Sequence, residues 1–240
     1  MNTTLSIVIP CYNEAKRLPR ARAVISQFFP MPSELVEIVL VNDGSRDDTA
    51  AVMADWKGQD ERVRLLSHVP NRGKGYAIRR GMRAATADWV LFMDADMATP
   101  MAMWERFRPH LAEASVLIGT RKGTGSEITK HQPWLRENMG KVFTTLSNLM
   151  LGLNLTDFTC GFKAFRRDAC QAIFSRQTLN DWSYDSEILF LVGHLHYDIR
   201  EVAVSWQNDD DTKVRLLRAT LAALGGLFKI RLKSAWGAYR

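Results

Sequence analysis

Two aspartates separated by one residue, Asp94 and Asp96, follow the apolar segment Trp89-Val-Leu-Phe-Met93. The segment has the character of a buried strand that ends where the two aspartates begin. At a strand end that turns into a loop, both carboxylates can reach one hard cation. Oxygen ligands suit Mg²⁺ or Mn²⁺, which then bridge to substrate phosphates. We therefore predict a metal site at Asp94 and Asp96, with a solvated turn as the alternative for a lone Asp-X-Asp triplet.

Two further polar clusters stand near the ends of apolar segments. The segment 36–41 is followed by Asn42-Asp43-Gly44-Ser45, where Asp43 can bind a nucleobase imide or ribose hydroxyls, or else cap the next helix. Asn71-Arg-Gly-Lys74-Gly offers flexible backbone N–H groups, a lysine and a helix start, which together favour phosphate. It is not a Walker A loop, and no Gly-X-Gly-X-X-Gly follows the first apolar segment. P-loop NTPases and dinucleotide-binding dehydrogenases therefore lose their best support.

Apolar periodicity predicts the elements that must position these clusters. We expect strands at 5–10, 36–41, 62–67, 89–93, 116–119 and 201–206, helices at 17–29, 48–56, 75–85, 138–151 and 181–194, and a mobile loop at 123–132. Strands that alternate with helices predict right-handed crossovers and a parallel sheet. Ligands of such sheets bind beyond the carboxyl ends of the strands, which is where the polar clusters fall.

Charge is distributed unevenly along the 240 residues. The composition, 46% hydrophobic and 24% charged, is that of a globular α/β domain and excludes disorder as the main state. The formal net charge of +6 divides into −1 for residues 1–212 and +7 for residues 213–240. A nucleic-acid-binding domain spreads basic residues over its folded surface, so this division argues against nucleic acid as a partner. We predict a catalytic domain at 1–212 and a basic C-terminal segment at 213–240.

The C-terminal segment has an amphipathic pattern. On a helix, an apolar stripe lies beside a basic one, formed respectively by Leu217, Leu221, Leu224, Phe228, Leu232 and Tyr239, and by Arg215, Arg218, Lys229, Lys233 and Arg240. This pattern suits a helix that lies in a membrane interface, with a bend at Gly225-Gly226. The alternatives are a helix packed on the domain and an oligomer contact.

The sequence also predicts a compartment. Three cysteines without ligand spacing indicate free thiols in a reducing environment. No signal-peptide pattern is present, and the longest apolar stretch, 219–228, has about half the length that crosses a bilayer. We expect a cytoplasmic protein that is peripheral on the cytoplasmic face of a membrane.

Six motifs in fixed order resemble a known family. They are Val8-Ile-Pro10-Cys-Tyr12-Asn-Glu14, Val41-Asn-Asp43-Gly-Ser45, Asn71-Arg-Gly-Lys74-Gly, Asp94-Ala95-Asp96, Asp157-Phe-Thr-Cys-Gly161-Phe-Lys163 and Tyr184-Asp185-Ser-Glu187. The set is similar to the inverting family 2 glycosyltransferases of GT-A fold, and within them to the dolichyl-phosphate mannose synthase and dolichyl-phosphate glucosyltransferase branch. The resemblance covers residues 5 to about 215. It implies an α/β, Rossmann-like, mostly parallel sheet flanked by helices.

The resemblance implies that a hexose moves, with inversion, from UDP-glucose or GDP-mannose to a polyprenyl or dolichyl phosphate, with Mg²⁺ or Mn²⁺ as cofactor. The nucleotide sugar would be bound by Pro10, Tyr12, Glu14, Asp43, Lys74, Asp94, Ala95, Asp185 and Glu187, the last two at the sugar end. The acceptor phosphate would be bound by Arg121, Lys122, Arg136, Lys141 and Lys213. Catalytic roles would fall to Asp96, Arg121, Arg136 and Asp157, with Asp157 as general base or, alternatively, as a helix or turn cap.

Two positions depart from the family pattern. Asn42 replaces the first of two aspartates, and Ala98 stands where relatives carry a polar residue, so no third side-chain metal ligand is expected there. Two other functions remain open: a saccharide hydroxyl as acceptor, and a non-catalytic nucleotide-sugar-binding partner subunit. Assembly into an oligomer also remains open.

Overall fold

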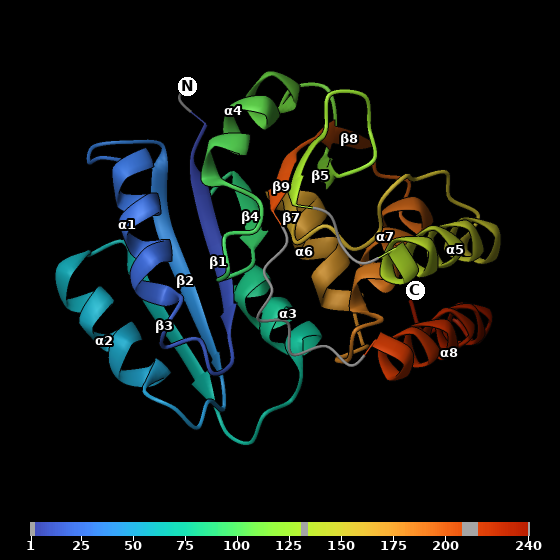
Figure 1. Cartoon of the computed structure of the whole chain (residues 1–240), viewed down its shortest axis with the longest axis horizontal. Coiled ribbons are helices and arrows are strands. Elements are labelled where there is room, and N and C mark those ends of the chain that lie inside the picture. Colours follow the sequence, from blue (N-terminus) through green and yellow to red (C-terminus); the bar gives the residue numbers. More distant parts are fainter. Residues whose placement is uncertain (1–2, 131–133, 208–215, 240) are drawn as a thin grey trace.

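A seven-stranded sheet is the centre of the computed structural model, which describes residues 3–130, 134–207 and 216–239 (Figure 1). Its strands are β1 (Leu5–Cys11), β2 (Leu35–Asp43), β3 (Val63–His68), β4 (Trp89–Met93), β5 (Val116–Thr120), β7 (Phe162–Arg166) and β8 (Ile199–Ala203). They lie in the order β3-β2-β1-β4-β7-β5-β8. All neighbours are parallel except β7, which is antiparallel to both β4 and β5. The predicted, mostly parallel α/β sheet is confirmed.

Helices cover both faces of this sheet. One face carries α1 (Leu18–Phe28), α2 (Thr49–Gln59) and α4 (Trp104–Phe107), the last between short 3-10 turns at Met101–Met103 and Arg108–His110. The other carries α3 (Lys74–Ala84), α6 (Arg167–Arg176) and α7 (Tyr184–His194). Alternate residues of β1 enter the two cores, Ile7 and Ile9 on one side and Val8 on the other. A strand buried on both faces must be apolar throughout, which explains its unbroken apolar sequence.

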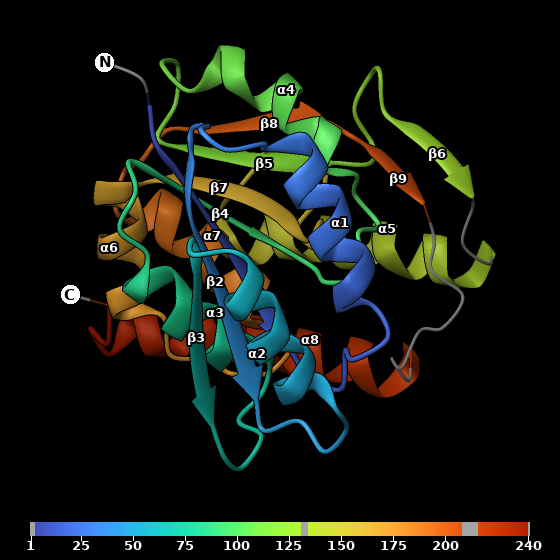
Figure 2. The same ribbon diagram turned by 90° about the vertical axis from the view of Figure 1, so that its left-hand side faces the viewer.

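The second half departs from the expected elements. A separate two-stranded parallel sheet pairs β6 (Glu127–Lys130) with β9 (Ser205–Gln207), and Figure 2 shows it standing apart from the main sheet. The predicted loop at 123–132 therefore contains a strand, and the predicted strand at 201–206 is two strands, β8 and β9. Neither β7 nor α6 was predicted, although β7 lies between β4 and β5.

The C-terminal helix α8 (Leu216–Ala235) packs on α7 and on α5 (Trp134–Leu151). It buries Leu227 and Ile230 in the core beneath α7, where Tyr239, just beyond the helix, is also buried, as the packed alternative required. The predicted bend at Gly225-Gly226 is wrong, because the helix runs through both glycines. A Cβ at Gly226 would collide with Ser183, so glycine here permits close approach to the start of α7. Among the described residues, no helix is both long and apolar enough to cross a membrane.

Candidate active site

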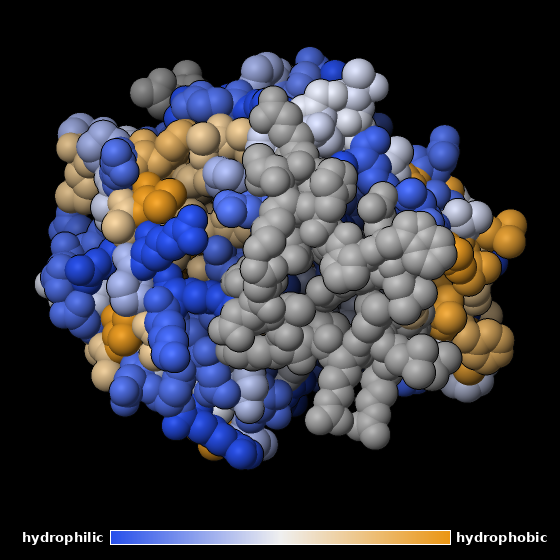
Figure 3. All heavy atoms as spheres, in the orientation of Figure 1, coloured by the Kyte–Doolittle hydropathy of each residue, from blue (hydrophilic) through white to orange (hydrophobic). Residues whose placement is uncertain are grey.

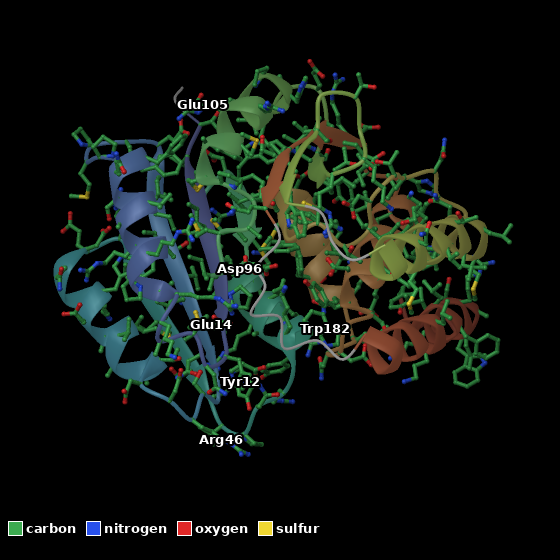
Figure 4. All side chains as sticks on the ribbon, viewed as in Figure 1. Tyr12, Glu14, Arg46, Asp96, Glu105 and Trp182 are labelled. Atoms are coloured by element: carbon green, nitrogen blue, oxygen red, sulfur yellow. The ribbon has the colours of Figure 1, made fainter. Side chains whose placement is uncertain are left out.

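The turns after β1, β2 and β3 meet at the carboxyl edge of the sheet, where Figure 4 places Tyr12 and Glu14. Asn13 joins the first two turns: its backbone N–H donates to Ser45 Oγ at 3.0 Å, and its side-chain oxygen accepts from the Arg46 N–H at 2.8 Å. Gly44 lies against the backbone of Asn71, and its positive φ of 68° explains the glycine. Parallel strands bring these distant turns together, as expected.

Asp94 and Asp96 lie in the turn directly after β4, on either side of buried Ala95. Asp96 accepts the Ala98 N–H at 3.0 Å, which tightens the turn. Burial and the nearby Asp94 carboxylate raise the pKa of Asp96, and a divalent cation shared by the two carboxylates would relieve this repulsion. No cluster of three or more His, Cys, Asp or Glu side chains able to hold a metal occurs within the described residues. The donor set therefore fits a cation that takes its remaining ligands from substrate oxygens and water.

Lys74, at the start of α3, forms an ion pair with this acidic turn. Its Nζ lies 2.6 Å from Asp94 Oδ1. The ring centres of Trp182 and Tyr184 lie 5.5 and 6.0 Å from this Nζ. Burial lowers the pKa of Lys74, but the surrounding carboxylates, Asp94 first, outweigh burial and raise it. A diphosphate is negatively charged, so it could interact both with the charged lysine and with a metal ion at the predicted site.

Asp43, at the end of β2, is buried and holds the loop at residues 71–73, which belongs to the motif predicted to favour phosphate. Its carboxylate accepts the backbone N–H groups of Arg72 at 2.7 Å and Gly73 at 3.0 Å, and the side-chain amide of Asn71 at 2.9 Å. His68 Nε2 lies 2.6 Å from the same carboxylate. Asp43 does not cap α2, which begins after Asp48. Its predicted contact with a nucleoside remains a prediction, and the structure adds a loop-holding role.

The other residues predicted for the nucleotide differ in exposure. Tyr12 is 37% exposed, and Pro10 is partly buried at the end of β1. The Glu14 carboxylate accepts from Arg17 Nη1 at 3.0 Å. Asn42 departs from the family pattern but shapes the turn, because its side-chain oxygen accepts the Ser45 N–H at 2.9 Å.

Asp185 and Glu187 were both expected at the sugar end, but the structure separates them. The two positions are two apart on α7 and therefore point to different sides of the helix. Asp185 binds the fully buried Lys163 of β7 at 2.6 Å. Glu187 instead accepts the Leu179 N–H at 2.7 Å and the Tyr239 hydroxyl at 2.7 Å. Glu187 thus anchors the C-terminal end of the chain, and its hydrogen bonds within the described residues go to Thr178, Leu179 and Tyr239 rather than to the acidic turn.

Arg121 and Asp157 form a bidentate ion pair. Arg121 Nε lies 2.6 Å from Asp157 Oδ2, and Nη2 lies 2.8 Å from Oδ1. Burial would raise the pKa of Asp157, but the Arg121 guanidinium outweighs burial and holds that pKa well below its usual range. The Cα atoms of Asp157 and Gly161 are at most about 14 Å apart, and Gly161 lies against Asp94, so the chain holds the ion pair near the acidic turn.

The remaining residues predicted for the acceptor are less fully described. Lys122 Nζ donates to Thr144 Oγ1 of α5 at 2.9 Å, and Lys141 is exposed on the same helix. The side chain of Arg136 and the whole of Lys213 lie outside the described residues.

The sequence interpretation did not single out three residues of the candidate site. His68 contacts Asp43, Lys163 holds Asp185, and Gly161 leaves room for Asp94. Lys163 and Gly161 stand within one of the quoted motifs, which was the available signal. His68 had none, because its partner is 25 residues away.

Comparisons with known proteins show the family to which the chain belongs. The family described as Glycosyl transferase family 2 matches residues 6–174. A dolichyl-phosphate beta-glucosyltransferase of Drosophila melanogaster is 31% identical, over 98% of this chain and 77% of that protein. The Homo sapiens protein of the same name is 30% identical, with the same two shares.

Solved structures share the fold. Mannosyl-3-phosphoglycerate synthase from Rubrobacter xylanophilus has a TM-score of 0.74 and 17% identity, over 97% of this chain and 75% of that one. Glucosyl-3-phosphoglycerate synthase from Mycobacterium tuberculosis, in complex with Mn²⁺, UDP-glucose and phosphoglyceric acid, has a TM-score of 0.71 and 19% identity, over 95% and 79%. Together with the family match, this likeness confirms the predicted GT-A fold. The chain belongs to glycosyl transferase family 2 and is a glycosyltransferase.

Proposed function

We propose that the chain transfers glucose from UDP-glucose to a polyprenyl phosphate of the dolichyl type, with inversion and with Mg²⁺ or Mn²⁺. The sequence left UDP-glucose and GDP-mannose open. The names of the relatives favour glucose, and the neighbour that holds Mn²⁺ and UDP-glucose supports this donor and a divalent cation.

One observation carries the proposal: the ion pair of Arg121 with buried Asp157 lies within reach of the donor-type site. Asp94, Asp96 and Lys74 suit the diphosphate of a nucleotide sugar. Arg121, carried by the turn that follows β5, offers a guanidinium whose fork binds Asp157 and whose Nη1 donors can bind a phosphate. A site with cationic groups for two separate phosphates favours a phosphorylated acceptor over a plain sugar hydroxyl.

The donor half works through charge. A divalent cation held by Asp94 and Asp96 would neutralise the leaving diphosphate as its bond to the sugar breaks. Lys74 can exchange Asp94 for a phosphate oxygen when the donor binds, because its ammonium group is a flexible point charge. Asp43 keeps the loop at 71–73 in place for this exchange.

The acceptor half needs little proton transfer. A phosphate monoester has its second pKa near about 6, so it is largely dianionic at neutral pH. Its oxygen can attack the sugar carbon from the face opposite the diphosphate, which inverts that carbon. Orientation by Arg121 and, as the sequence suggests, by Lys122, Arg136, Lys141 and Lys213 then contributes more than a base would.

Helix α8 supports a lipid acceptor, because it has two apolar faces. Ile230 is buried, whereas Leu232, about 200° further around the helix, is 38% exposed. Phe228 and Trp236, one turn to either side of Leu232, are 64% and 76% exposed, and Val142 and Leu149 are exposed on neighbouring α5. Figure 3 shows hydrophobic residues on the side of the molecule where Figure 1 draws α5 and α8.

Basic residues flank this apolar surface. Lys229 and Arg231 are exposed on either side of the stripe formed by Phe228, Leu232 and Trp236. Each basic residue near an anionic leaflet contributes about 1 kcal/mol. We therefore propose that α5 and α8 hold the enzyme peripherally on the cytoplasmic face of a membrane. The three buried free thiols suit that reducing compartment.

Labelled donors test the function directly. Protein with Mn²⁺ and a short polyprenyl phosphate is given labelled UDP-glucose or labelled GDP-mannose, and the lipid is extracted into organic solvent. We expect label in the lipid phase from UDP-glucose and not from GDP-mannose. Label from GDP-mannose alone would show that the donor is GDP-mannose and not UDP-glucose. No label from either would reject the lipid acceptor, and UDP binding without any transfer would favour the partner-subunit alternative.

Vesicle sedimentation tests the membrane surface. Replacing both Phe228 and Trp236 by serine removes two side chains whose burial is worth about 1.5–3 kcal/mol each, so binding to anionic vesicles should fall at least about 10-fold. Met31→Ser is the matched control, because Met31 is 57% exposed between α1 and β2. Equal vesicle binding by all three proteins would reject this surface.

A further inference from the structure

The Arg121–Asp157 pair leaves the carboxylate without a free acceptor position. Asp157 Oδ2 accepts from Arg121 Nε at 2.6 Å and from the Arg121 backbone N–H at 3.3 Å. Its Oδ1 accepts from Arg121 Nη2 at 2.8 Å and from the Thr159 N–H at 3.0 Å. An ionised carboxylate has about four lone-pair positions, and all four are occupied. The side chain is 2% exposed, so a substrate proton could reach it only after the ion pair opened.

The backbone at Asp157 is in turn held by hydrogen bonds to a neighbouring strand. Glu201 of β8 accepts the backbone N–H groups of Thr156 at 2.9 Å and Asp157 at 3.2 Å, and the Thr156 hydroxyl at 2.7 Å. The Thr156 hydroxyl also lies 2.6 Å from that of Thr120, at the end of β5. Two neighbouring strands of the sheet therefore fix the backbone that carries the carboxylate, which is the arrangement that a rigid anchor requires.

The contacts of Arg121 fix the orientation of its guanidinium as well as balancing its charge. Nε and Nη2 face Asp157, Nη2 also donates to Thr159 Oγ1 at 2.8 Å, and the Trp206 ring lies 5.3 Å from the guanidinium carbon. Across the described ranges, no hydrogen bond engages Nη1. The guanidinium thus keeps the two N–H groups of Nη1 for an incoming anion, while its Nε and Nη2 donors are engaged by Asp157 and Thr159.

We propose that Asp157 is a positioning residue that holds Arg121 for the acceptor phosphate and takes no proton in the reaction. This inference rests on the proposed function for the identity of the acceptor. In the step, a phosphate oxygen forms a bond to the anomeric carbon, the bond from that carbon to the diphosphate breaks, and the electron pair leaves with the nucleoside diphosphate. No proton changes place, so the depressed pKa of Asp157 does not impede the step.

Two nucleophiles distinguish positioning from base catalysis. Water must lose a proton when it hydrolyses UDP-glucose slowly in the absence of acceptor, whereas a phosphate dianion need not. Asp157→Asn should therefore lower kcat/KM for polyprenyl phosphate about 10- to 100-fold, the value of charge-assisted hydrogen bonds, and leave hydrolysis within about 2-fold. Arg121→Lys, which keeps the charge but loses the fork, should reproduce both results.

A double-mutant cycle completes the test. If Asp157 acts through Arg121, the double variant Arg121→Ala with Asp157→Asn should transfer glucose no more slowly than Arg121→Ala alone. The matched control is Asp168→Asn, which breaks the similar but exposed bidentate pair with Arg166 and should change neither activity. Mn²⁺-dependent UDP binding, measured by calorimetry, identifies variants that remain folded, and Arg121→Lys serves if Asp157→Asn does not.

Each outcome decides between the two roles. A parallel fall in hydrolysis and transfer with Asp157→Asn, or additive losses in the double variant, would identify a base and overturn the proposal. If the wild type transfers nothing to lipid, the proposed function fails, yet the hydrolysis comparison still decides the role of Asp157. Unchanged hydrolysis in a variant that binds UDP would then support the anchor, and reduced hydrolysis would reject it.

Discussion

Replacing Gly161 by alanine would insert a methyl group into the space that the Asp94 carboxylate occupies. An added Cβ would lie 2.7 Å from Asp94 Cγ, where ordinary contacts are 3.4–4 Å, so the carboxylate would have to move by about 1 Å. Gly161 has no positive φ, and Asp94 is the flexible end of a partly exposed side chain. We therefore expect the fold to adjust at little cost in stability, while Asp94, the predicted metal ligand, loses its position.

Misplacement of a group by about 1 Å can cost about 10²-fold, and lost support of a metal ligand costs about 10- to 100-fold in affinity. Gly161→Ala should thus weaken Mn²⁺-dependent UDP binding by about 10- to 100-fold in calorimetry, with Tm changed by a few degrees at most. Gly58→Ala is the control, because a Cβ there meets nothing within 4 Å. Wild-type UDP affinity in Gly161→Ala would refute the assignment of Asp94 as a ligand.

Three further predictions follow from buried contacts. Asp43→Asn removes acceptor positions for the loop at 71–73, so UDP affinity measured by calorimetry should fall about 10-fold, and an unchanged affinity would contradict the loop-holding role. Tyr239→Phe removes the hydroxyl bound to Glu187 and should lower the free energy of unfolding in urea by about 1–3 kcal/mol without changing UDP affinity; a drop in affinity instead would place Glu187 in the site. The pKa of Asp157 is depressed, so the ionised carboxylate stabilises the fold at every pH above its unfolded pKa of about 3.9, and this stabilisation is lost only as pH falls through the folded pKa. The difference in Tm between the wild type and Asp157→Asn should therefore be equal at about pH 5.5 and about pH 8. A smaller difference at the lower pH would contradict this.

The first half of the fold could be predicted because its signals are local. The strands β1 and β4 are short apolar runs, and the boundaries expected for them at 5–10 and 89–93 agree with the structure to within a residue. The strand β7 was missed because Lys163 interrupts its apolar character. That lysine is fully buried only because Asp185, 22 residues later, pairs with it, and no local pattern reveals such a partner.

The sequence predicted which residues form the candidate site, but not the contacts that its members make with one another. The sequence identified Asp43, Asp157 and Glu187 as polar residues of quoted motifs. In the structure, Asp43 holds a loop, Asp157 holds an arginine and Glu187 anchors the C-terminal end of the chain. In the C-terminal segment, one face of α8 packs on the domain, while Phe228, Leu232 and Trp236 are exposed; contact with a membrane stays a prediction.

The sequence by itself determined the α/β class, the order of the first strands and the turns that carry the chemistry, because apolar runs and turn residues act over a few neighbouring positions. Only the tertiary structure decided what each buried polar group does. Arg121 meets Asp157 across 36 residues, and Glu187 meets Tyr239 across 52. A buried charge is stable only beside its partner, and the fold alone brings such partners together.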